Sequence, residues 1–322
     1  MMKRRTLIRH ALAYSALALA PPLRLAAAET AAQTTAPASP SATLPLWDRG
    51  TPGNETMGGA SQRSAKGALS HVVTPMLEVF MPARPNGSAA LIAGGGGYKR
   101  IQMESEAYPA ARWLAQRGVT AFVLDYRLPG DGWAAGPLAP LQDAQRAIRL
   151  IRANAHVYGL DPARLLALGF SAGGHLMGMA AARPDFASYP PQDDIDKLSA
   201  QVSAAALIYP VVTLRAPYDR TSTRRVLIGP HPTAKESAGW SVDTWIGKLM
   251  PPLFAVQAQD DPIADPANIT ILSQAADQAG VPIETHRLST GGHGFGMGKA
   301  GSPSAEWPTW FEHWLREHGL VA

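Results

Sequence analysis

The chain contains no cysteine in its 322 residues. Disulfide bonds, thiolate nucleophiles and metal sites with cysteine ligands are therefore excluded. No long run of one charge sign occurs either, since 29 lysines and arginines stand against 25 aspartates and glutamates. Beyond the first residues the basic side chains are scattered and do not alternate with aromatic ones. Nucleic acid is therefore not an expected partner.

Sequence patterns that hold metals or nucleotides are also missing. No His-Glu-x-x-His occurs, and neither Asp193-Asp194 nor Asp260-Asp261 is followed by the spacing of a calcium loop. The four glycines at 94–97 lack the Lys-Ser/Thr ending of a phosphate loop, and no Gly-x-Gly-x-x-Gly opens a helix there. We expect no metal and no cofactor.

Residues 1–28 have the features of an export signal. A charged start with the pair Arg4-Arg5 precedes a modestly apolar stretch from Ala11 to Ala20, and Ala26-Ala27-Ala28 supplies a small-residue cleavage pattern. The arginine pair resembles a twin-arginine signal. An uncleaved membrane anchor is the alternative, but the stretch is short and Pro21-Pro22 interrupts it. We predict a periplasmic or secreted protein without a stable membrane anchor.

The composition changes after this segment. Residues 29–43 consist of Ala, Thr, Ser, Pro and Gln almost throughout and cannot bury a core, so they are predicted to be a disordered linker. Residues 44–322 show no internal repeat and no second change of hydrophobic pattern. They are long enough for one sizeable domain, which we predict to be catalytic.

Strands and helices are predicted to alternate along this domain. Short apolar runs indicate buried strands at 89–93, 119–126, 165–168, 204–209, 253–257 and 283–288, and helical spacing appears at 106–116, 142–155, 268–279 and 307–318. This order predicts an α/β fold with a mostly parallel sheet and helices on both faces. Residues 72–81 mix apolar and polar side chains around Pro75, which fits an edge strand. Residues 210–250 have little periodicity, and we expect them, with the loop around Trp133, to shape the substrate rim.

The segment Gly169-Phe170-Ser171-Ala172-Gly173-Gly174 lies between a predicted strand and a predicted helix. A Gly-x-Ser-x-Gly turn at such a junction holds the serine at a strained position and needs tiny neighbours, so that the helix can fold back on the strand. The turn also directs the N–H of Ala172 at the place where an oxyanion would form. The alternative is a helix start capped by Ser171, with the glycines there by chance.

A serine nucleophile needs a base within hydrogen-bond reach, and the base needs an acid. His293 follows the last predicted strand in a glycine-rich loop and is the best candidate for this base. The acid is Asp261 or its neighbour Asp260, both of which follow an earlier strand; we favour Asp261. The order Ser, Asp, His along the chain is that of α/β-hydrolases. His175, inside the helix predicted to follow the turn at Gly169–Gly174, is interpreted as structural.

The four glycines that follow the strand at 89–93 are interpreted as a loop that lends backbone N–H groups to an oxyanion hole, because only glycine lets a backbone come that close to a reacting carbonyl. A flexible loop without a role is the alternative. Arg100, Glu104 and Glu106 follow this loop and are candidates for substrate contact, although such residues more often form a solvated helix start.

Six motifs together resemble the α/β-hydrolase esterases related to acetylxylan and feruloyl esterases: Gly95–Tyr98, Glu106 with 112–114, Asp125–Leu128, Gly169–His175, Pro251-Pro252 and Gly292–Phe295. The resemblance covers about residues 44–318. It implies Ser171 as nucleophile, Asp261 as acid, His293 as base, and Gly96, Gly97 and Ala172 as oxyanion donors. Two positions differ from the usual pattern, Gly94 in place of Pro or His and Gln257 in place of His.

The sequence thus predicts an exported serine esterase that removes short acyl groups, acetyl above all, from small-molecule or polysaccharide esters such as xylan. One alternative is a serine peptidase of the dipeptidyl or prolyl oligopeptidase type, although those enzymes usually carry a large additional domain for which residues 44–322 have no room. Another alternative is a binding protein without catalysis on a hydrolase fold.

Overall fold

The computed structural model describes residues 39–52 and 58–322. The predicted export signal at 1–28 and most of the predicted linker lie outside the described residues, so both remain predictions. Each helix in the described part of the chain is too short or too polar to serve as a membrane span.

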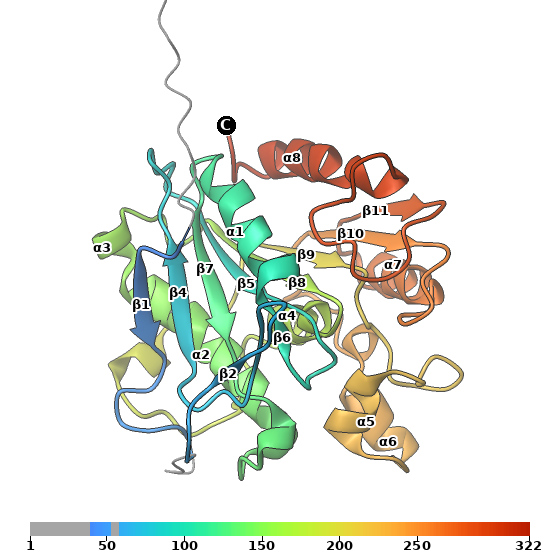
Figure 1. Cartoon of the computed structure of the whole chain (residues 1–322), viewed down its shortest axis with the longest axis horizontal. Coiled ribbons are helices and arrows are strands. Elements are labelled where there is room, and N and C mark those ends of the chain that lie inside the picture. The colour runs from blue at the N-terminus through green and yellow to red at the C-terminus, as the bar shows by residue number, and fades with distance from the viewer. Residues whose placement is uncertain (1–38, 53–57) are drawn as a thin grey trace, which may run out of the picture. The chain divides into compact units, whose positions relative to one another are not determined.

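An eight-stranded sheet forms the centre of the domain (Figure 1). In spatial order its strands are β1 (Ala42–Pro45), β4 (Met76–Phe80), β7 (Thr120–Asp125), β5 (Ala89–Ala93), β8 (Leu165–Phe170), β9 (Ala204–Ile208), β10 (Leu253–Ala258) and β11 (Ile283–Leu288). β4 runs antiparallel to β1 and to β7, and the other neighbours pair in parallel. The predicted α/β-hydrolase architecture with a mostly parallel sheet is confirmed.

Helices follow most of these strands. They are the π-helix η1 (Met103–Ala107), which continues into α1 (Tyr108–Ala115), then α2 (Ala139–Ala153), α3 (Ala155–Tyr158), α4 (Ala172–Ala182), α5 (Ser222–Ile228), α6 (Ala234–Gly239), α7 (Ala267–Ala279) and α8 (Trp307–Glu317). Single 3-10 turns are η2 (Pro129–Asp131), η3 (Gly136–Leu138), η4 (Asp194–Lys197), η5 (Val242–Thr244) and η6 (Pro303–Ala305). A small antiparallel sheet is made of β2 (Gln62–Arg63), β3 (Ala68–Ser70) and β6 (Ile101–Gln102).

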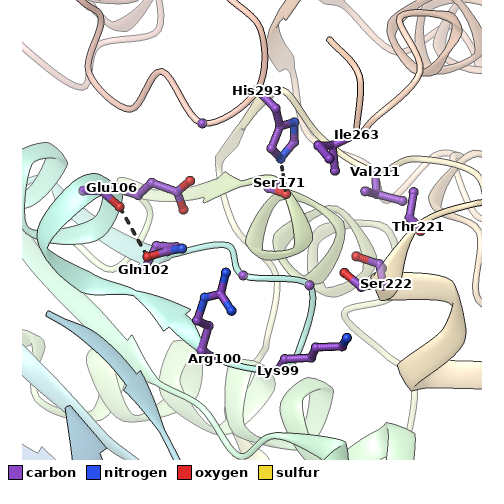
Figure 2. Close-up of a pocket in the computed structure, with 15 residues that line it drawn as sticks. Lys99, Arg100, Gln102, Glu106, Ser171, Val211, Thr221, Ser222, Ile263 and His293 are labelled. Carbon is purple, nitrogen blue, oxygen red and sulfur yellow. Dashed lines mark hydrogen bonds between the residues drawn. The ribbon is translucent and has the colours of Figure 1, made fainter. Parts of the chain in front are cut away.

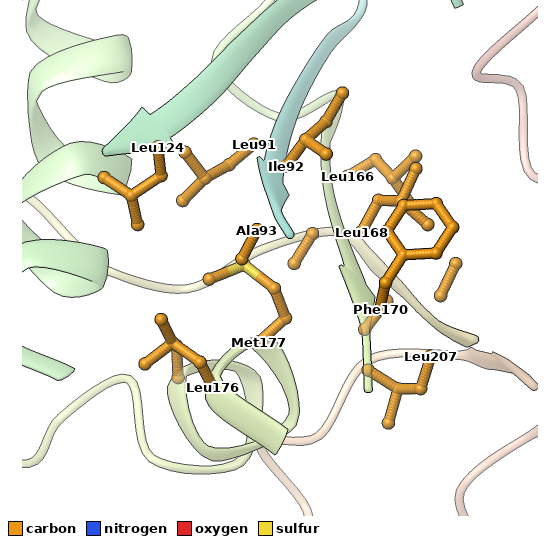
Figure 3. Packing of buried hydrophobic residues seen from close by; sticks show 14 of the residues in the cluster. Leu91, Ile92, Ala93, Leu124, Leu166, Leu168, Phe170, Leu176, Met177 and Leu207 are labelled. Carbon is orange, nitrogen blue, oxygen red and sulfur yellow. The ribbon is translucent and has the colours of Figure 1, made fainter. Parts of the chain in front are cut away.

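The inner strands are apolar on both faces because helices cover both. Every residue of β5, β7, β8, β9 and β10 is buried. In Figure 3, Met177 of α4 lies beside Ala93 at the end of β5, and Leu176 and Met177 belong to the same buried cluster as Leu91, Leu168 and Leu207 of the strands. This packing holds the helix that follows Ser171 rigidly against the sheet.

Two predictions about the N-terminal side of the sheet are wrong. β4 is not an edge strand, because β1 pairs with it on the outer side; Pro75 stands just before the strand, where its carbonyl accepts the N–H of Leu46. The predicted linker 29–43 extends too far, since Ala42 and Thr43 pair with β4. The row of N–H and C=O groups along β4 requires a partner, and this requirement orders a stretch of chain whose composition alone favours disorder.

Residues 210–250, which have little periodicity, fold as two short helices and a 3-10 turn without contributing a strand. Thr221 caps α5 through its side chain, and Thr233 with Glu236 forms a capping box at α6. The start of the segment is anchored by Asn268 of α7, whose Oδ1 accepts the N–H groups of Val212 and Thr213 at 2.7 and 3.1 Å. Polar contacts to distant elements, together with isolated buried side chains such as Leu214 and Val242, therefore place this segment.

Candidate active site

Ser171 sits on a strained turn between β8 and α4, with φ 53° and ψ −116°. A Cβ at Gly169 would lie 2.2 Å from the carbonyl oxygen of Gly173, and one at Gly173 would lie 2.2 Å from that of Ala93. Any larger residue at either place would collide with backbone, which explains why the turn needs glycine on both sides of the serine.

His293 and Asp261 complete a hydrogen-bonded row with this serine. The Nε2 atom of His293 lies 2.7 Å from Ser171 Oγ (Figure 2), and its Nδ1 atom lies 2.7 Å from Asp261 Oδ2. A carboxylate can only accept, so the Nδ1 proton faces Asp261 and Nε2 is left to accept the serine proton. The three residues come from the carboxyl ends of β8, β10 and β11, which the parallel sheet brings to one edge.

The two neighbouring aspartates have different contacts. Asp261 is buried; its Oδ1 accepts the N–H groups of Ile263 and Ala264, and its Oδ2 also accepts the Nε2 amide of Gln257 at 2.8 Å. Asp260 is exposed and accepts the N–H of Gly292 at 2.8 Å. Asp261 therefore orients the histidine ring, while Asp260 holds the loop that carries it.

The glycine loop after β5 lies on the other side of Ser171. Gly96 and Gly97 have φ values of 126° and 65°, and a Cβ on them would lie 2.2 Å from the carbonyl oxygen of Arg100 and 1.9 Å from Ser222 Oγ. Both line the pocket in front of the serine. Gly95 differs, because its N–H donates to the Oε2 atom of Glu106 at 2.6 Å. Its N–H is thus already engaged within the protein.

Ala172 is the first residue of α4 and is fully buried. The first N–H groups of a helix have no partner within it, so the N–H of Ala172 is free of the helical hydrogen-bond ladder. The structure thus places the three predicted oxyanion residues, Gly96, Gly97 and Ala172, beside the serine or in the loop that faces it.

A buried polar network behind the site was not found by sequence reasoning. Tyr209, directly after β9, has φ 38°. Its hydroxyl donates to Glu106 Oε1 at 3.1 Å and accepts the N–H of Gly296 at 3.0 Å. The Tyr209 ring packs edge-on against His293, with centroids 5.0 Å apart. Burial raises the pKa of Glu106 and of Tyr209. The network connects the glycine loop to the loop that carries His293. The only hint of it in the sequence was the position of Tyr209 as the last residue of a predicted strand.

The pocket in front of Ser171 has a volume of about 420 Å³. Its lining is largely polar and comprises Gly96, Gly97, Lys99, Arg100, Gln102, Ser105, Glu106, Ser171, Val211, Thr221, Ser222, Thr223, Ile263, His293 and Gly294. Residues 210–250 contribute to this pocket through Val211 and the start of α5, in line with the prediction that they help to shape the substrate rim. Trp133 is buried and does not line the pocket, and neither do Trp240 and Trp245. Among the earlier candidates for substrate contact, Arg100 and Glu106 line it and Glu104 does not.

His175 lies inside α4 with both ring nitrogens in use. Its Nδ1 is 2.9 Å from the Tyr98 hydroxyl and its Nε2 is 2.6 Å from the Trp240 carbonyl oxygen. Burial lowers the pKa of the imidazole to about 4. A neutral ring donates to the Trp240 carbonyl and accepts from the Tyr98 hydroxyl. His175 is therefore structural and connects α4 to the segment at 210–250. In residues 39–52 and 58–322, no three histidine or acidic side chains are grouped so that they could hold a metal ion.

Known proteins resemble this chain over most of its domain. It is 32% identical over 206 residues to endo-1,4-beta-xylanase B of Butyrivibrio fibrisolvens, covering 63% of this chain and 32% of the relative. It is 27% identical over 239 residues to the acetylxylan esterase of Xylanibacter ruminicola, covering 73% of this chain and 44% of that relative. The chain thus spans a third to less than half of the length of these two relatives.

A solved structure extends the likeness to the whole fold. The acetyl ester-xyloside bifunctional hydrolase of Caldicellulosiruptor lactoaceticus superposes with a TM-score of 0.72 at 28% identity, over 88% of this chain and 98% of that one. The sequence matches the BD-FAE family over residues 77–275. The chain therefore belongs to the BD-FAE family and has the α/β-hydrolase fold.

Proposed function

We propose that the protein is a carboxylic ester hydrolase in which Ser171 is the nucleophile, His293 the base and Asp261 the acid. The observation that carries the proposal is the row of hydrogen bonds, 2.7 Å from Ser171 Oγ to His293 and 2.7 Å from His293 to Asp261. The relatives named as esterases support the same reaction class.

In the first step, Ser171 Oγ attacks the ester carbonyl while His293 Nε2 takes the serine proton. The imidazolium that results is stabilised by the buried carboxylate of Asp261. The negative charge on the former carbonyl oxygen is accepted by the N–H groups of Gly96, Gly97 and Ala172, and loss of one such donor typically costs a hundredfold or more in rate. Gly95 is not assigned a role as donor because Glu106 holds its N–H.

In the second step, His293 returns the proton to the leaving alcohol oxygen as the C–O bond breaks, and the acyl group stays on Ser171. Water, deprotonated by His293, then attacks the acyl carbonyl, and the proton on Nε2 goes back to Ser171 as the carboxylic acid leaves. The strained turn at Ser171 serves both steps, since it keeps Oγ at the histidine.

The proposed substrates are short acyl esters of sugars or polysaccharides, with acetyl groups on xylan first. Likeness to an acetylxylan esterase and to an acetyl ester-xyloside hydrolase supports this choice, as does a polar pocket of about 420 Å³. The predicted signal at 1–28 supports a periplasmic or secreted location, where such polymers are met. Nucleic acid is not a proposed partner.

Replacement of Ser171 tests the mechanism. Ser171→Ala should lower 4-nitrophenyl acetate hydrolysis by roughly four orders of magnitude or more. Ser199→Ala, on an exposed loop away from the pocket, is the matched control. Full activity in Ser171→Ala would show that Ser171 is not the nucleophile.

A series of 4-nitrophenyl esters from acetate to decanoate, with acetylated xylan alongside, tests the substrate class. We expect the highest kcat/KM for acetate, together with acetate release from the polymer. Faster cleavage of long acyl chains, or of aminoacyl nitroanilides, would contradict the proposed substrate.

A further inference from the structure

Two cations at the mouth of the pocket have no counter-charge. Lys99 and Arg100 line the pocket and are exposed, and within the part of the chain that the structure describes neither side chain makes a hydrogen bond or an ion pair. The buried arginines behave differently, since Arg127 pairs with Asp143 at 2.9 Å and Arg146 pairs with Asp196 at 2.9 Å. Lys99 and Arg100 therefore keep their full donor capacity for a molecule in the pocket.

Their backbone is held next to the reacting atoms. The N–H of Lys99 donates to the Gly96 carbonyl at 3.2 Å, and a Cβ on Gly96 would lie 3.0 Å from Arg100 Cγ, so the Arg100 stem packs on the glycine loop. Between Gly97 and Lys99, Tyr98 is buried with its hydroxyl on His175. Figure 2 shows Lys99 and Arg100 across the pocket from His293, with Ser171 between. A group bound to them would be part of an ester whose carbonyl is at Ser171.

The acidic residue that lines the same pocket does not neutralise them. Glu106 is 4% exposed, and its two oxygens are engaged with the N–H of Gly95 and the hydroxyl of Tyr209. The pocket mouth therefore presents net positive charge, and clefts lined by one sign of charge concentrate ligands of the other sign.

We propose that Lys99 and Arg100 form a subsite for a carboxylate that the ester substrate itself carries, either on the alcohol, as in an acylated uronic acid, or on the acyl group, as in a half-ester of a dicarboxylic acid. The inference rests on the proposed function, because it names the substrate class of the same pocket. A guanidinium binds a carboxylate with two parallel hydrogen bonds, and the neighbouring ammonium adds a point charge.

Two matched substrate pairs show whether the carboxylate belongs to the alcohol or to the acyl group of the ester. On the alcohol side, a monoacetylated methyl glucuronide is compared with the monoacetylated methyl glucoside, which has a hydroxymethyl group in place of the carboxylate. On the acyl side, 4-nitrophenyl hemisuccinate is compared with 4-nitrophenyl butyrate. We expect kcat/KM for the acidic member of one pair to exceed that of its neutral partner by roughly tenfold, and the pair that shows it identifies the side.

Substitutions then test whether the two cations cause the preference. In K99Q/R100Q the ratio of acidic to neutral kcat/KM should fall to about one, mainly through KM, and R100K should retain part of it. Arg84→Gln removes an exposed cation near the opposite end of β5 that forms no ion pair with the described residues, and it should leave the ratio unchanged. Salt at about 0.5 M should lower the wild-type ratio, because exposed charges are screened.

The possible outcomes distinguish a failure of the carboxylate subsite from a failure of the proposed ester hydrolysis. Equal rates within both pairs, or a preference that survives in K99Q/R100Q with its melting temperature intact, would overturn the subsite while ester hydrolysis stands. If none of the four esters is hydrolysed, or Ser171→Ala hydrolyses them equally well, the proposed function fails and the subsite falls with it.

Discussion

The turn at Gly169–Gly174 and the segment at 210–250 form two sides of one pocket, but different forces hold them. The turn is determined by contacts over a few residues, where Gly169 and Gly173 have no room for a Cβ and Ser171 is held at φ 53°. The segment makes no strand and is positioned by distant side chains, Asn268 at its start and His175 near its end.

The turn carries the proposed nucleophile and the segment shapes the pocket, so the catalytic chemistry and the shape of the site depend on different kinds of contact. Steric requirements of a tight turn admit one or two residue types, so they leave a motif in the sequence and preserve the position of the nucleophile. Long-range polar contacts can be made by many residue combinations, so the segment that borders the substrate leaves no motif. We therefore expect changes at the turn and its partner loops to abolish the reaction, and changes in the segment to alter stability or selectivity.

After the loss of Ser171 itself, the largest effect is expected among the residues that support it chemically, at the two adjacent aspartates. Asp261→Asn should lower kcat/KM by about three to four orders of magnitude, because the Nδ1 proton of His293 loses its carboxylate. Asp260→Asn should cost less than about tenfold, since an amide oxygen can still accept the N–H of Gly292. Steady-state kinetics with 4-nitrophenyl acetate measure both, and equal losses would mean that the assignment of Asp261 is wrong.

A pair of glycines compares the two regions directly. Gly173→Ala places a Cβ 2.2 Å from the carbonyl oxygen of Ala93, and should lower the free energy of unfolding by about 3 kcal/mol or more. At Gly239, the last residue of α6, a Cβ would have no other atom of the described residues within 4 Å. Gly239→Ala should raise the free energy of unfolding by about 0.5 kcal/mol. Urea denaturation measures both, and a tolerated Gly173→Ala would contradict the steric account of the turn.

A pH-dependent effect is expected where the two regions meet, at His175. The pKa of its buried imidazole is about 4, against an ordinary value of 6.5. An unfolded chain therefore takes up a proton below pH 6.5 that the folded chain refuses, so stability is highest above pH 6.5 and is lost as the pH falls towards 4. The loss through this group should reach about 2 kcal/mol by pH 4.5.

His175→Gln can keep a donor for Trp240 and an acceptor for Tyr98 without a group that titrates in this range. Its unfolding free energy should therefore fall less than that of the wild type between pH 7 and pH 4.5, measured by urea denaturation at both values. An identical fall in the two proteins would show that His175 does not link stability to pH.

Much of the site could be anticipated because its parts lie at strand ends. Once strands were expected before Ser171, Asp261 and His293, a parallel sheet had to bring their carboxyl ends to one edge. The residues that support them could not be anticipated in the same way. Tyr209 and Gln257 bond to Glu106 and Asp261 only in the folded chain, and many other side chains could stand at those positions.

The sequence by itself determined the strand-and-helix alternation, the need for glycine around Ser171, and the candidates Ser171 and His293, because backbone sterics and periodicity act over a few neighbouring residues. Only the tertiary structure decided which aspartate faces the histidine, that the N–H of Gly95 donates to Glu106, and that β1 covers the edge of β4. It also decided that Lys99 and Arg100 both line the pocket and form no ion pair with any residue that the structure describes. These outcomes depend on distances between segments far apart in the chain, which no local pattern encodes.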